Sequence, residues 1–155
     1  MAKGTPATVA LGKAGVAFKL HEYDYDPTAA RIGMQAAEAL GVDPARLLKT
    51  LMAKTGGAVV CVLVPSDSEV SLKKLAAAAG AKDAAMLPPA EAERVTGYHV
   101  GGISPFGQRK RARVFVAQSA LAHASIIVNG GRRGLQIELA PADLVRMLEA
   151  TELSA

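Results

Sequence analysis

The spacing of apolar and polar residues predicts helices and strands that alternate along the chain. Thr5 followed by Pro6 is typical of a helix N-cap and first turn, and Gly41 and Gly80 stand where helices are expected to end. Strands are indicated by period-two alternation or by runs of β-branched residues. We predict helices over roughly residues 6–15, 32–40, 71–80, 88–97 and 141–150, and strands over roughly residues 17–25, 49–54, 59–64, 83–86, 113–118, 125–129 and 135–139.

The segment from Lys49 to Pro65 predicts a β-hairpin that turns at Gly56 and Gly57. Its second arm is apolar on both faces, which is typical of a central strand. Two hairpins and a late run of strands argue against a doubly wound parallel sheet. We therefore expect an α+β fold in a single domain over residues 1–155. Its curved, mainly antiparallel mixed sheet should be barrel-like, with helices packed outside it.

Composition narrows the setting of this fold. Half of the residues are hydrophobic but only 4% are aromatic, so the core should be aliphatic. The single cysteine, Cys61, excludes an intramolecular disulfide and a cysteine-rich metal site. The sequence has no signal-peptide pattern and no apolar run near the ~20 residues of a membrane span. We expect a cytoplasmic protein with no membrane partner.

Residues 96–113 combine glycine, proline and positive charge more densely than any other segment. Gly101 and Gly102 permit positive φ and close approach by another molecule, and Pro105 restricts the loop. Such a loop can present backbone N–H groups to a negative charge, or it can be an ordinary tight turn. The cations that follow it are Arg109, Lys110, Arg111 and Arg113. With a formal charge of +4, the chain is compatible with an anionic partner.

The sequence lacks the common metal and nucleophile motifs. His21, His99 and His123 are not spaced as metal ligands, and no GxSxG segment is present. The glycine segment does not fit a GxxxxGK[ST] phosphate loop, because Ser104-Pro105 stands where a helix should begin. We expect no metal and no cofactor.

Four other positions are candidates for a site. Lys49 lies among leucines at the start of a strand, which would direct its ammonium to one place; on these residues alone, a strand-edge lysine that reaches solvent is the favoured alternative. Tyr23 either lines a pocket or packs. Arg132 and Arg133, in a glycine turn, form either a solvated tip or a phosphate clamp.

Five ordered segments resemble the YbaK/EbsC-type aminoacyl-tRNA deacylases, in particular the cysteinyl-tRNA(Pro) deacylase branch. They are LKTL (Leu48–Leu51), SLKKLAAAAGAK (Ser71–Lys82), TGY (Thr96–Tyr98), VGGISPFGQRKR (Val100–Arg111) and GGRRGLQIEL (Gly130–Leu139). Their order and spacing match the family, and the resemblance extends from about Thr5 to Met147.

The resemblance implies a free-standing editing domain, homologous to the insertion domain of bacterial prolyl-tRNA synthetases. Such a domain removes a wrongly attached amino acid from the 3′ end of tRNA. Lys49 matches the family's functional lysine, and the segment from Gly101 to Pro105 matches its GxxxP loop, so the amides of Gly101 and Gly102 are expected to face the ester carbonyl. In cysteine-specific members the substrate's own thiol attacks that carbonyl, and the thiolactone product makes the reaction lyase-like.

The resemblance also implies the contacts to the substrate. Expected amino-acid contacts are Tyr23, Ile32, Ile103, Ser104, Pro105, Asn129 and Gln136, and expected tRNA contacts are Arg109, Lys110, Arg111, Arg113, Arg132 and Arg133. The expected partner is the acceptor end of an aminoacylated tRNA, with prolyl-tRNA synthetase as a candidate protein partner.

Three positions depart from the pattern of this branch. Ile32 stands where phenylalanine is common, and Asn129 and Gln136 stand where serine and aspartate are common. The loss of a carboxylate at Gln136 leaves the amino-acid specificity open. The alternatives are a deacylase for alanine or serine, and a non-catalytic module that binds tRNA or a synthetase in a salt-dependent manner.

Overall fold

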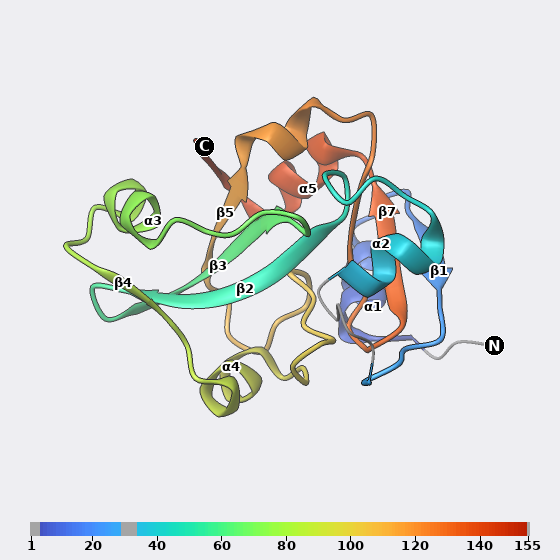
Figure 1. Cartoon of the computed structure of the whole chain (residues 1–155), viewed down its shortest axis with the longest axis horizontal. Helices are drawn as coiled ribbons and strands as arrows, with labels where there is room; N and C mark the ends of the chain where they lie inside the picture. Colours follow the sequence, from blue (N-terminus) through green and yellow to red (C-terminus); the bar gives the residue numbers. More distant parts are fainter. Residues whose placement is uncertain (1–3, 29–33, 155) are drawn as a thin grey trace.

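The computed structural model describes residues 4–28 and 34–154 of the chain, and these residues form an α+β fold (Figure 1). The α-helices are α1 (Pro6–Lys13), α2 (Gln35–Leu40), α3 (Leu72–Ala79), α4 (Pro89–Thr96) and α5 (Pro141–Leu148). The strands are β1 (Lys19–Glu22), β2 (Leu48–Thr55), β3 (Ala58–Pro65), β4 (Ala84–Met86), β5 (Arg113–Ala117), β6 (Ile126–Asn129), β7 (Leu135–Leu139) and β8 (Thr151–Leu153). A 3₁₀ segment, η2 (Gln118–Ala122), follows β5.

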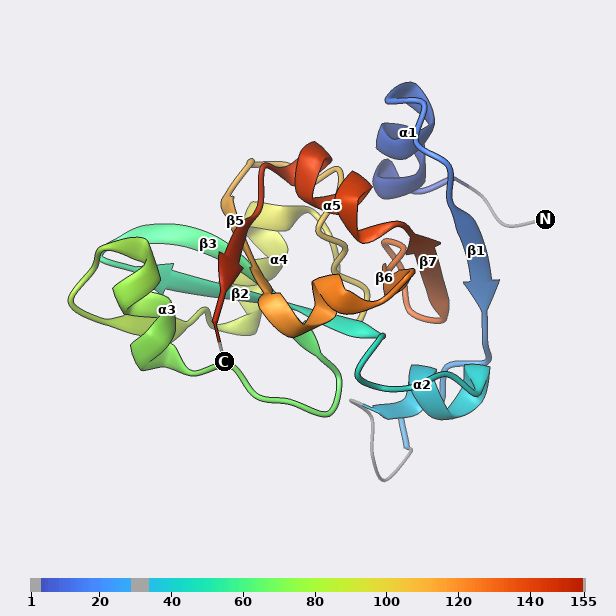
Figure 2. The ribbon, with the colours of Figure 1, turned by 90° about the horizontal axis from the view of Figure 1, so that it is seen from above.

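The strands form two sheets. One has five strands in the order β4-β2-β3-β5-β8, and the other has three in the order β1-β7-β6. Pairing is antiparallel except between β3 and β5 and between β5 and β8, which are parallel. Figure 2 shows the β2–β3 hairpin at one end of the molecule and β1 with β7 at the other. The mixed, mainly antiparallel α+β fold is as predicted.

The predicted barrel-like closure is wrong, because the structure divides the strands between these two sheets. Among the described residues, a single parallel bridge between Leu47 and Ile127 joins the sheets. Strand β6 is the edge strand of the smaller sheet and pairs with β7 along one edge. At its other edge the described residues form only the bridge to the chain before β2, where the Ile127 N–H donates to the Arg46 carbonyl at 3.0 Å.

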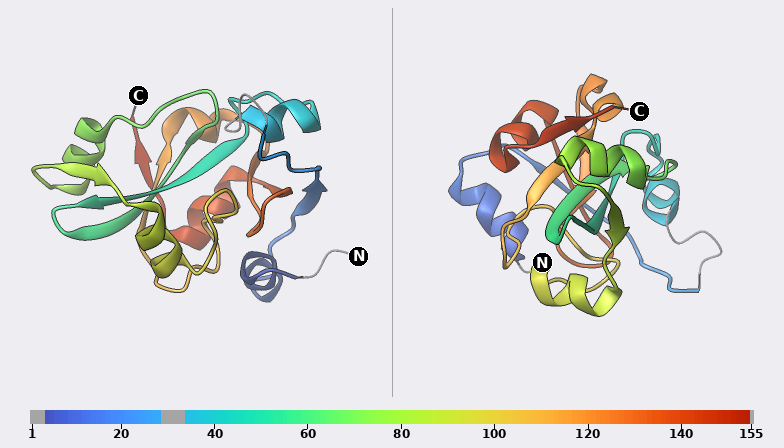
Figure 3. Two further views of the ribbon diagram at one scale, coloured as in Figure 1. Left: turned by 60° about the horizontal axis from the view of Figure 1, so that its bottom comes forward. Right: turned by 90° about the vertical axis from the view of Figure 1, so that its left-hand side faces the viewer.

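The β2–β3 hairpin is the centre of the larger sheet, as its apolar second arm predicts. Alternate residues of β3 enter two different cores, because successive side chains of a strand point to opposite faces. Cys61 and Leu63 face the main core between the sheets, whereas Val60 and Val62 face the side that carries α3. Helices α3 and α4 accordingly lie on opposite sides of the hairpin (Figure 3).

Local signals in the sequence explain where the helices begin and end. The Thr5 hydroxyl accepts from the Thr8 N–H, and the Thr8 hydroxyl accepts from the Thr5 N–H, which closes a capping box on α1. Ser71 caps α3 in the same way through the Lys74 N–H. Helix α3 ends at Gly80, whose φ of 72° few other residues adopt without strain.

Candidate functional site

A cavity of about 330 Å³ opens where β2 meets the β6–β7 hairpin. Its lining also includes residues of α4, of the chain after β1 and of the glycine loop. Six of the residues predicted from the sequence line it: Tyr23, Lys49, Gly101, Ile103, Asn129 and Gln136. The fold therefore brings together positions that lie as far apart in the chain as β1 and β7.

Lys49 supplies the positive charge of this cavity. It lies near the start of β2 and pairs with Val64 of β3, and Leu48 and Leu51 lie beside it in the cavity wall. Within residues 4–28 and 34–154 the Lys49 ammonium has no ion pair and no hydrogen bond. An unpaired cation on an apolar wall is available to an anionic or carbonyl oxygen of a ligand.

Of the two amides at Gly101 and Gly102, one is free in the described structure and the other is engaged in a hydrogen bond. Gly101 has a φ of 91° and lines the cavity, and its N–H has no acceptor among the described residues. The Gly102 N–H instead donates to the His99 carbonyl at 2.8 Å, inside a turn. Of the two amides expected to face an ester carbonyl, only that of Gly101 is available in this structure.

The last two residues of the GxxxP segment, Ser104 and Pro105, are buried and do not face the cavity. Ser104 is fully buried, and its hydroxyl accepts from the Phe106 N–H at 3.3 Å. Pro105 is also buried and lines a different hollow, beside α5. Neither residue lines the main cavity. Ile32, the remaining predicted contact, lies outside the described residues.

The β6–β7 hairpin holds the outer side of the glycine loop. Arg133 donates from Nε and Nη2 to the Val100 carbonyl at 3.0 and 2.9 Å. Asn129 Nδ2 donates to the Gly101 carbonyl at 3.1 Å, and its own Oδ1 accepts from the Gly131 N–H at 2.7 Å. In Figure 1 the loop near residue 100 lies beside the turn of this hairpin.

Two polar side-chain atoms at the cavity are buried without any hydrogen-bond partner in the described structure: Thr50 Oγ1 and Gln136 Oε1. A buried acceptor without a partner costs free energy, so such atoms usually mark a place that a ligand or water fills. Burial, and next the neighbouring Tyr25, raise the pKa of the Tyr23 phenol, against hydrogen bonding with Gln136. Sequence reasoning missed Thr50, because strand alternation places its side chain on the opposite face of β2 from Lys49, whereas in the structure both residues line the cavity.

Two candidate nucleophiles in or near the cavity, the Cys61 thiol and the Ser66 hydroxyl, are poorly placed to react. Cys61 is completely buried, and burial raises the pKa of its thiol to about 12. Ser66, on the cavity wall, is buried and donates its hydroxyl hydrogen to the Leu47 carbonyl. A covalent step through either residue therefore has no support in this geometry.

The predicted tRNA-binding cations lie outside the cavity lining. Arg111 pairs with Glu149 at 3.3 Å, and Arg132 pairs with Glu22 at 3.2 Å, both at the surface. The Arg113 guanidinium lies 4.6 Å from the centre of the Phe115 ring. Arg109 and Lys110 are exposed. These cations therefore lie at the surface of the molecule and not in the wall of the cavity.

A charged cluster beside the cavity, which sequence reasoning also missed, joins the two sheets. Arg46 Nη2 contacts Glu138 Oε2 at 2.7 Å and the Ser125 hydroxyl at 3.1 Å, and His21 Nε2 lies 2.7 Å from Glu138 Oε1. Hydrogen bonds from Ser125 and His21, helped by the Arg46 charge, lower the pKa of Glu138 to about 2. The cluster fixes the turn before Lys49 against the β6–β7 hairpin.

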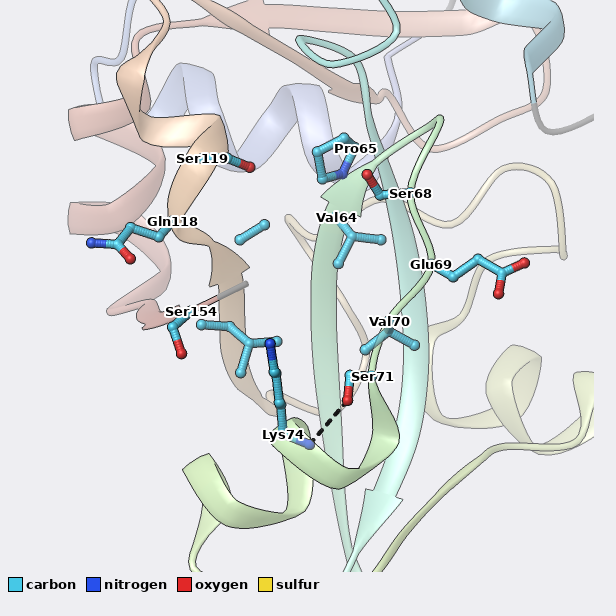
Figure 4. A pocket seen from close by; sticks show the side chains of 12 residues that line it. Val64, Pro65, Ser68, Glu69, Val70, Ser71, Lys74, Gln118, Ser119 and Ser154 are labelled. Carbon is cyan, nitrogen blue, oxygen red and sulfur yellow. Dashed lines mark hydrogen bonds between the residues drawn. The ribbon is translucent and has the colours of Figure 1, made fainter.

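A second cavity, of about 310 Å³, lies at the far end of β3 and β5, beside the first turn of α3 (Figure 4). Val64, Val70 and Leu153 form its apolar part, and Lys74 and several serines supply polar groups. None of its described polar side chains is both buried and unpartnered. It therefore lacks the feature that distinguishes the cavity at Lys49.

No helix among the described residues is long and apolar enough to cross a membrane. The same part of the chain contains no group of three or more His, Cys, Asp and Glu side chains arranged to hold a metal ion.

Comparison with known proteins assigns the chain to a family. Residues 26–147 match the aminoacyl-tRNA editing domain. The chain is 42% identical over 114 residues to an Enterococcus faecalis protein named "Putative Cys-tRNA(Pro)/Cys-tRNA(Cys) deacylase EbsC", a match that covers 72% of this chain and 68% of that protein. It is 37% identical over 71 residues to the proline–tRNA ligase of Acidithiobacillus ferrooxidans, covering 46% of this chain and 12% of the ligase.

The fold agrees with this assignment. The chain matches the crystal structure of "a putative trans-editing enzyme for prolyl tRNA synthetase" with a TM-score of 0.84, at 21% identity, over 96% of this chain and 93% of the other. At that identity the likeness shows the fold alone. The sequence match over most of its length shows that the chain belongs to the aminoacyl-tRNA editing domain family.

Proposed function

We propose that this protein is a trans-editing deacylase, which cleaves the ester between a wrongly attached amino acid and the 3′ end of a tRNA, with cysteinyl-tRNA(Pro) as the favoured substrate. The observation that carries the proposal is the meeting of an unpaired Lys49 ammonium and a free Gly101 amide at one small cavity. Membership of the editing family supports the reaction class. The name of the Enterococcus faecalis relative supports the choice of amino acid and tRNA.

The proposed role of these two donors is electrostatic. Attack on the ester carbonyl places a negative charge on its oxygen, and preorganised donors stabilise that charge. The Gly101 N–H is a fixed dipole, and Lys49 adds a full charge by a hydrogen bond to the carbonyl, terminal ribose or phosphate. Removal of one such donor from an acyl-transfer site typically costs ~3–4 kcal/mol of transition-state stabilisation.

The proposed nucleophile belongs to the substrate. The cysteinyl thiol attacks its own carbonyl carbon, so that a carbon–sulfur bond forms and the bond from that carbon to the ribose oxygen breaks. The thiol proton ends on the departing ribose hydroxyl, and the amino acid leaves as a thiolactone. Holding the thiol against the carbonyl can supply ~7–11 kcal/mol of the barrier. The poor nucleophiles Cys61 and Ser66 agree with a step that needs no protein nucleophile.

Gln136 Oε1 is the proposed selector of the amino acid. A carboxamide oxygen only accepts hydrogen bonds, and this one is buried without a partner. A cysteine thiol or a serine hydroxyl can donate to it, whereas an alanine methyl cannot. Sites built around a hydrogen bond discriminate strongly against analogues that lack it. The pocket therefore favours cysteine, with serine as the second candidate and alanine as the poorest.

The surface cations are proposed to hold the acceptor stem, and a prolyl-tRNA synthetase is proposed to help select tRNA(Pro). The exposed Arg109 and Lys110 have the character of phosphate contacts. Similarity to part of a proline–tRNA ligase supports a shared tRNA. Phosphate contacts predict that the KM for charged tRNA rises with salt concentration.

A panel of mischarged tRNAs tests the proposal. Initial rates are measured for Cys-tRNA(Pro), Ser-tRNA(Pro), Ala-tRNA(Pro) and correctly charged Pro-tRNA(Pro), with spontaneous hydrolysis subtracted. We expect cysteine to be released fastest and alanine at least ~10-fold more slowly. A faster rate for serine or alanine would reassign the substrate. Binding of all four without release would instead support the non-catalytic module.

A further inference from the structure

Arg133 is exposed, but its hydrogen bonds tie it to the glycine loop, which points to a role in holding that loop. Its guanidinium donates two hydrogen bonds to one oxygen, that of Val100, and lies 5.2 Å from the centre of the Tyr25 ring. Tyr25 itself lines the cavity. A side chain used mainly for a tRNA phosphate would point its donors outward, whereas this one holds the loop.

The peptide that Arg133 holds is the one that carries the free amide. In a trans peptide the carbonyl and the following N–H point in opposite directions. With the Val100 oxygen drawn toward the hairpin by Arg133, the Gly101 N–H points away from the hairpin and remains without an acceptor in the described structure. The orientation of this amide is thus set by the guanidinium.

Both glycines of the loop are needed for this contact. A Cβ on Gly101 would lie 2.9 Å from Arg133 Nε, and a Cβ on Gly102 would lie 2.8 Å from the Arg132 backbone. Side chains at these positions would push the loop from the hairpin. Asn129 restrains the next peptide through the Gly101 carbonyl, so two consecutive carbonyls are held from the same side.

We propose that Arg133 is a positioning residue for catalysis: by holding the Val100 carbonyl and stacking on Tyr25 it aims the Gly101 amide at the ester carbonyl. This inference rests on the proposed function. It assigns Arg133 to holding the glycine loop, in place of the tRNA contact expected from the sequence. In the described structure the side chain of the neighbouring Arg132 pairs with Glu22 and makes no hydrogen bond to the loop, so Arg132 serves as the comparison.

Kinetics of Arg133→Ala, Arg133→Lys and Arg132→Ala on Cys-tRNA(Pro) test the proposal. For Arg133→Ala we expect kcat to fall ~10- to 100-fold, with KM within about threefold of wild type. The Gly101 amide stabilises charge that develops only in the transition state, so misdirecting it lowers kcat and leaves KM little changed. The salt dependence of KM should not change. Arg133→Lys should recover part of kcat, because an ammonium can still donate to the Val100 oxygen. For Arg132→Ala we expect the opposite split, with a higher KM and a kcat near wild type.

A wild-type kcat for Arg133→Ala, with a raised KM and a weaker salt dependence, would overturn the proposal and make Arg133 a phosphate contact. Amide hydrogen exchange supplies a readout that needs no deacylation. Exchange over residues 98–103 should be faster in Arg133→Ala than in wild type or Arg132→Ala, and equal exchange would contradict the clamp. If wild type releases no amino acid from any tRNA, the proposed function fails while the exchange result still decides the role of Arg133.

Discussion

Gln136 is the side chain at the cavity whose chemistry is least satisfied by the fold. It is 4% exposed, and its Oε1 has no partner in the described structure. Burial raises the pKa of the Tyr23 phenol, and hydrogen bonding with the side chain of Gln136 acts against this shift. A protein selected for stability alone would not keep a buried acceptor in this state, because the missing hydrogen bond costs about 1–3 kcal/mol. Stability and substrate selection should therefore respond in opposite directions when this residue is changed.

We expect Gln136→Leu to leave the free energy of unfolding unchanged or to raise it by up to ~1 kcal/mol, since the unsatisfied acceptor is removed. The same change should reduce the preference for Cys-tRNA(Pro) over Ala-tRNA(Pro) by about 10-fold. Urea unfolding and the two initial rates measure both effects. A loss of more than ~2 kcal/mol with an unchanged preference would mean that Gln136 serves the core and not the substrate.

At the residue scale, the surroundings of Lys49 and the glycine loop made them candidates from the sequence, with an ordinary structural role as the alternative. Asn129 and Gln136 were reached through the family resemblance, because hydrophobic periodicity does not distinguish them. Thr50 was missed, because nothing in its spacing indicates a buried, unpartnered hydroxyl. The engaged amide of Gly102 was also beyond the sequence, since only the turn that contains His99 shows which N–H is used.

At the scale of elements, the cluster around Glu138 joins the turn before β2 to the β6–β7 hairpin. Arg46 immediately precedes Leu47 and β2, and Glu138 lies in β7, so their contact spans 92 residues of sequence. Ser125, which immediately precedes β6, and His21 of β1 also take part in the cluster. The cluster makes the placement of Lys49 depend on a carboxylate that must stay ionised.

The stability that Glu138 contributes should vanish in acid. Its folded pKa of about 2 lies below the ~4.3 of an unfolded glutamate, so the contribution is complete above the unfolded pKa and is lost as pH falls toward about 2. We expect Glu138→Gln to cost about 1–2 kcal/mol at pH 6, reduced by partial solvent exposure, and progressively less between pH 4.5 and 2.5. Chemical unfolding across that range measures it.

Glu149→Gln is the matched control, because Glu149 is 82% exposed in its pair with Arg111. Its effect should stay within ~0.5 kcal/mol at every pH. If Glu138→Gln were as stable as wild type at pH 6, the cluster would not carry the coupling assigned to it.

Two glycines test how the loop is packed against α1. A Cβ at Gly107, where φ is 67°, would lie 2.6 Å from the Pro6 carbonyl carbon and oxygen, whereas a Cβ at Gly12 within α1 meets nothing within 4 Å. We expect Gly107→Ala to lose ~2–4 kcal/mol and Gly12→Ala to gain ~0.5–1 kcal/mol, by urea unfolding with unchanged m-values. Similar stabilities for the two variants would show that the loop yields to the added methyl group.

Elements with local signals were predicted well, and those without them were missed. The helices α1 and α3 have polar N-caps, and α3 ends at a glycine, so their bounds follow from the sequence. Strand β8 was not predicted. The helix before it is capped by Glu149, a non-glycine residue with a φ of 51°, and β8 has only three residues in which alternation could show.

At the scale of the whole molecule, the division into two sheets could not be predicted from spacing. Strand β6 pairs with β7, its neighbour in the sequence, but the pairing of β1 with β7 and the bridge from Leu47 to Ile127 join residues far apart in the chain. The parallel pairing of β3 with β5 is likewise set by a crossover of more than 40 residues. The cavity forms where the two sheets meet, so its shape belongs to the tertiary structure and not to any one motif.

The proposed reaction requires that the two sheets bring Lys49 to an ester held against the glycine loop. The direct measurement is the initial rate of Cys-tRNA(Pro) deacylation by wild type, Lys49→Ala and Lys54→Ala. Lys54 lies on the same strand, 46% exposed and 3.7 Å from Glu91, outside the cavity. We predict a ~100-fold or greater loss for Lys49→Ala and a rate within about threefold of wild type for Lys54→Ala. Equal rates for wild type and Lys49→Ala, or no release by wild type, would contradict the account.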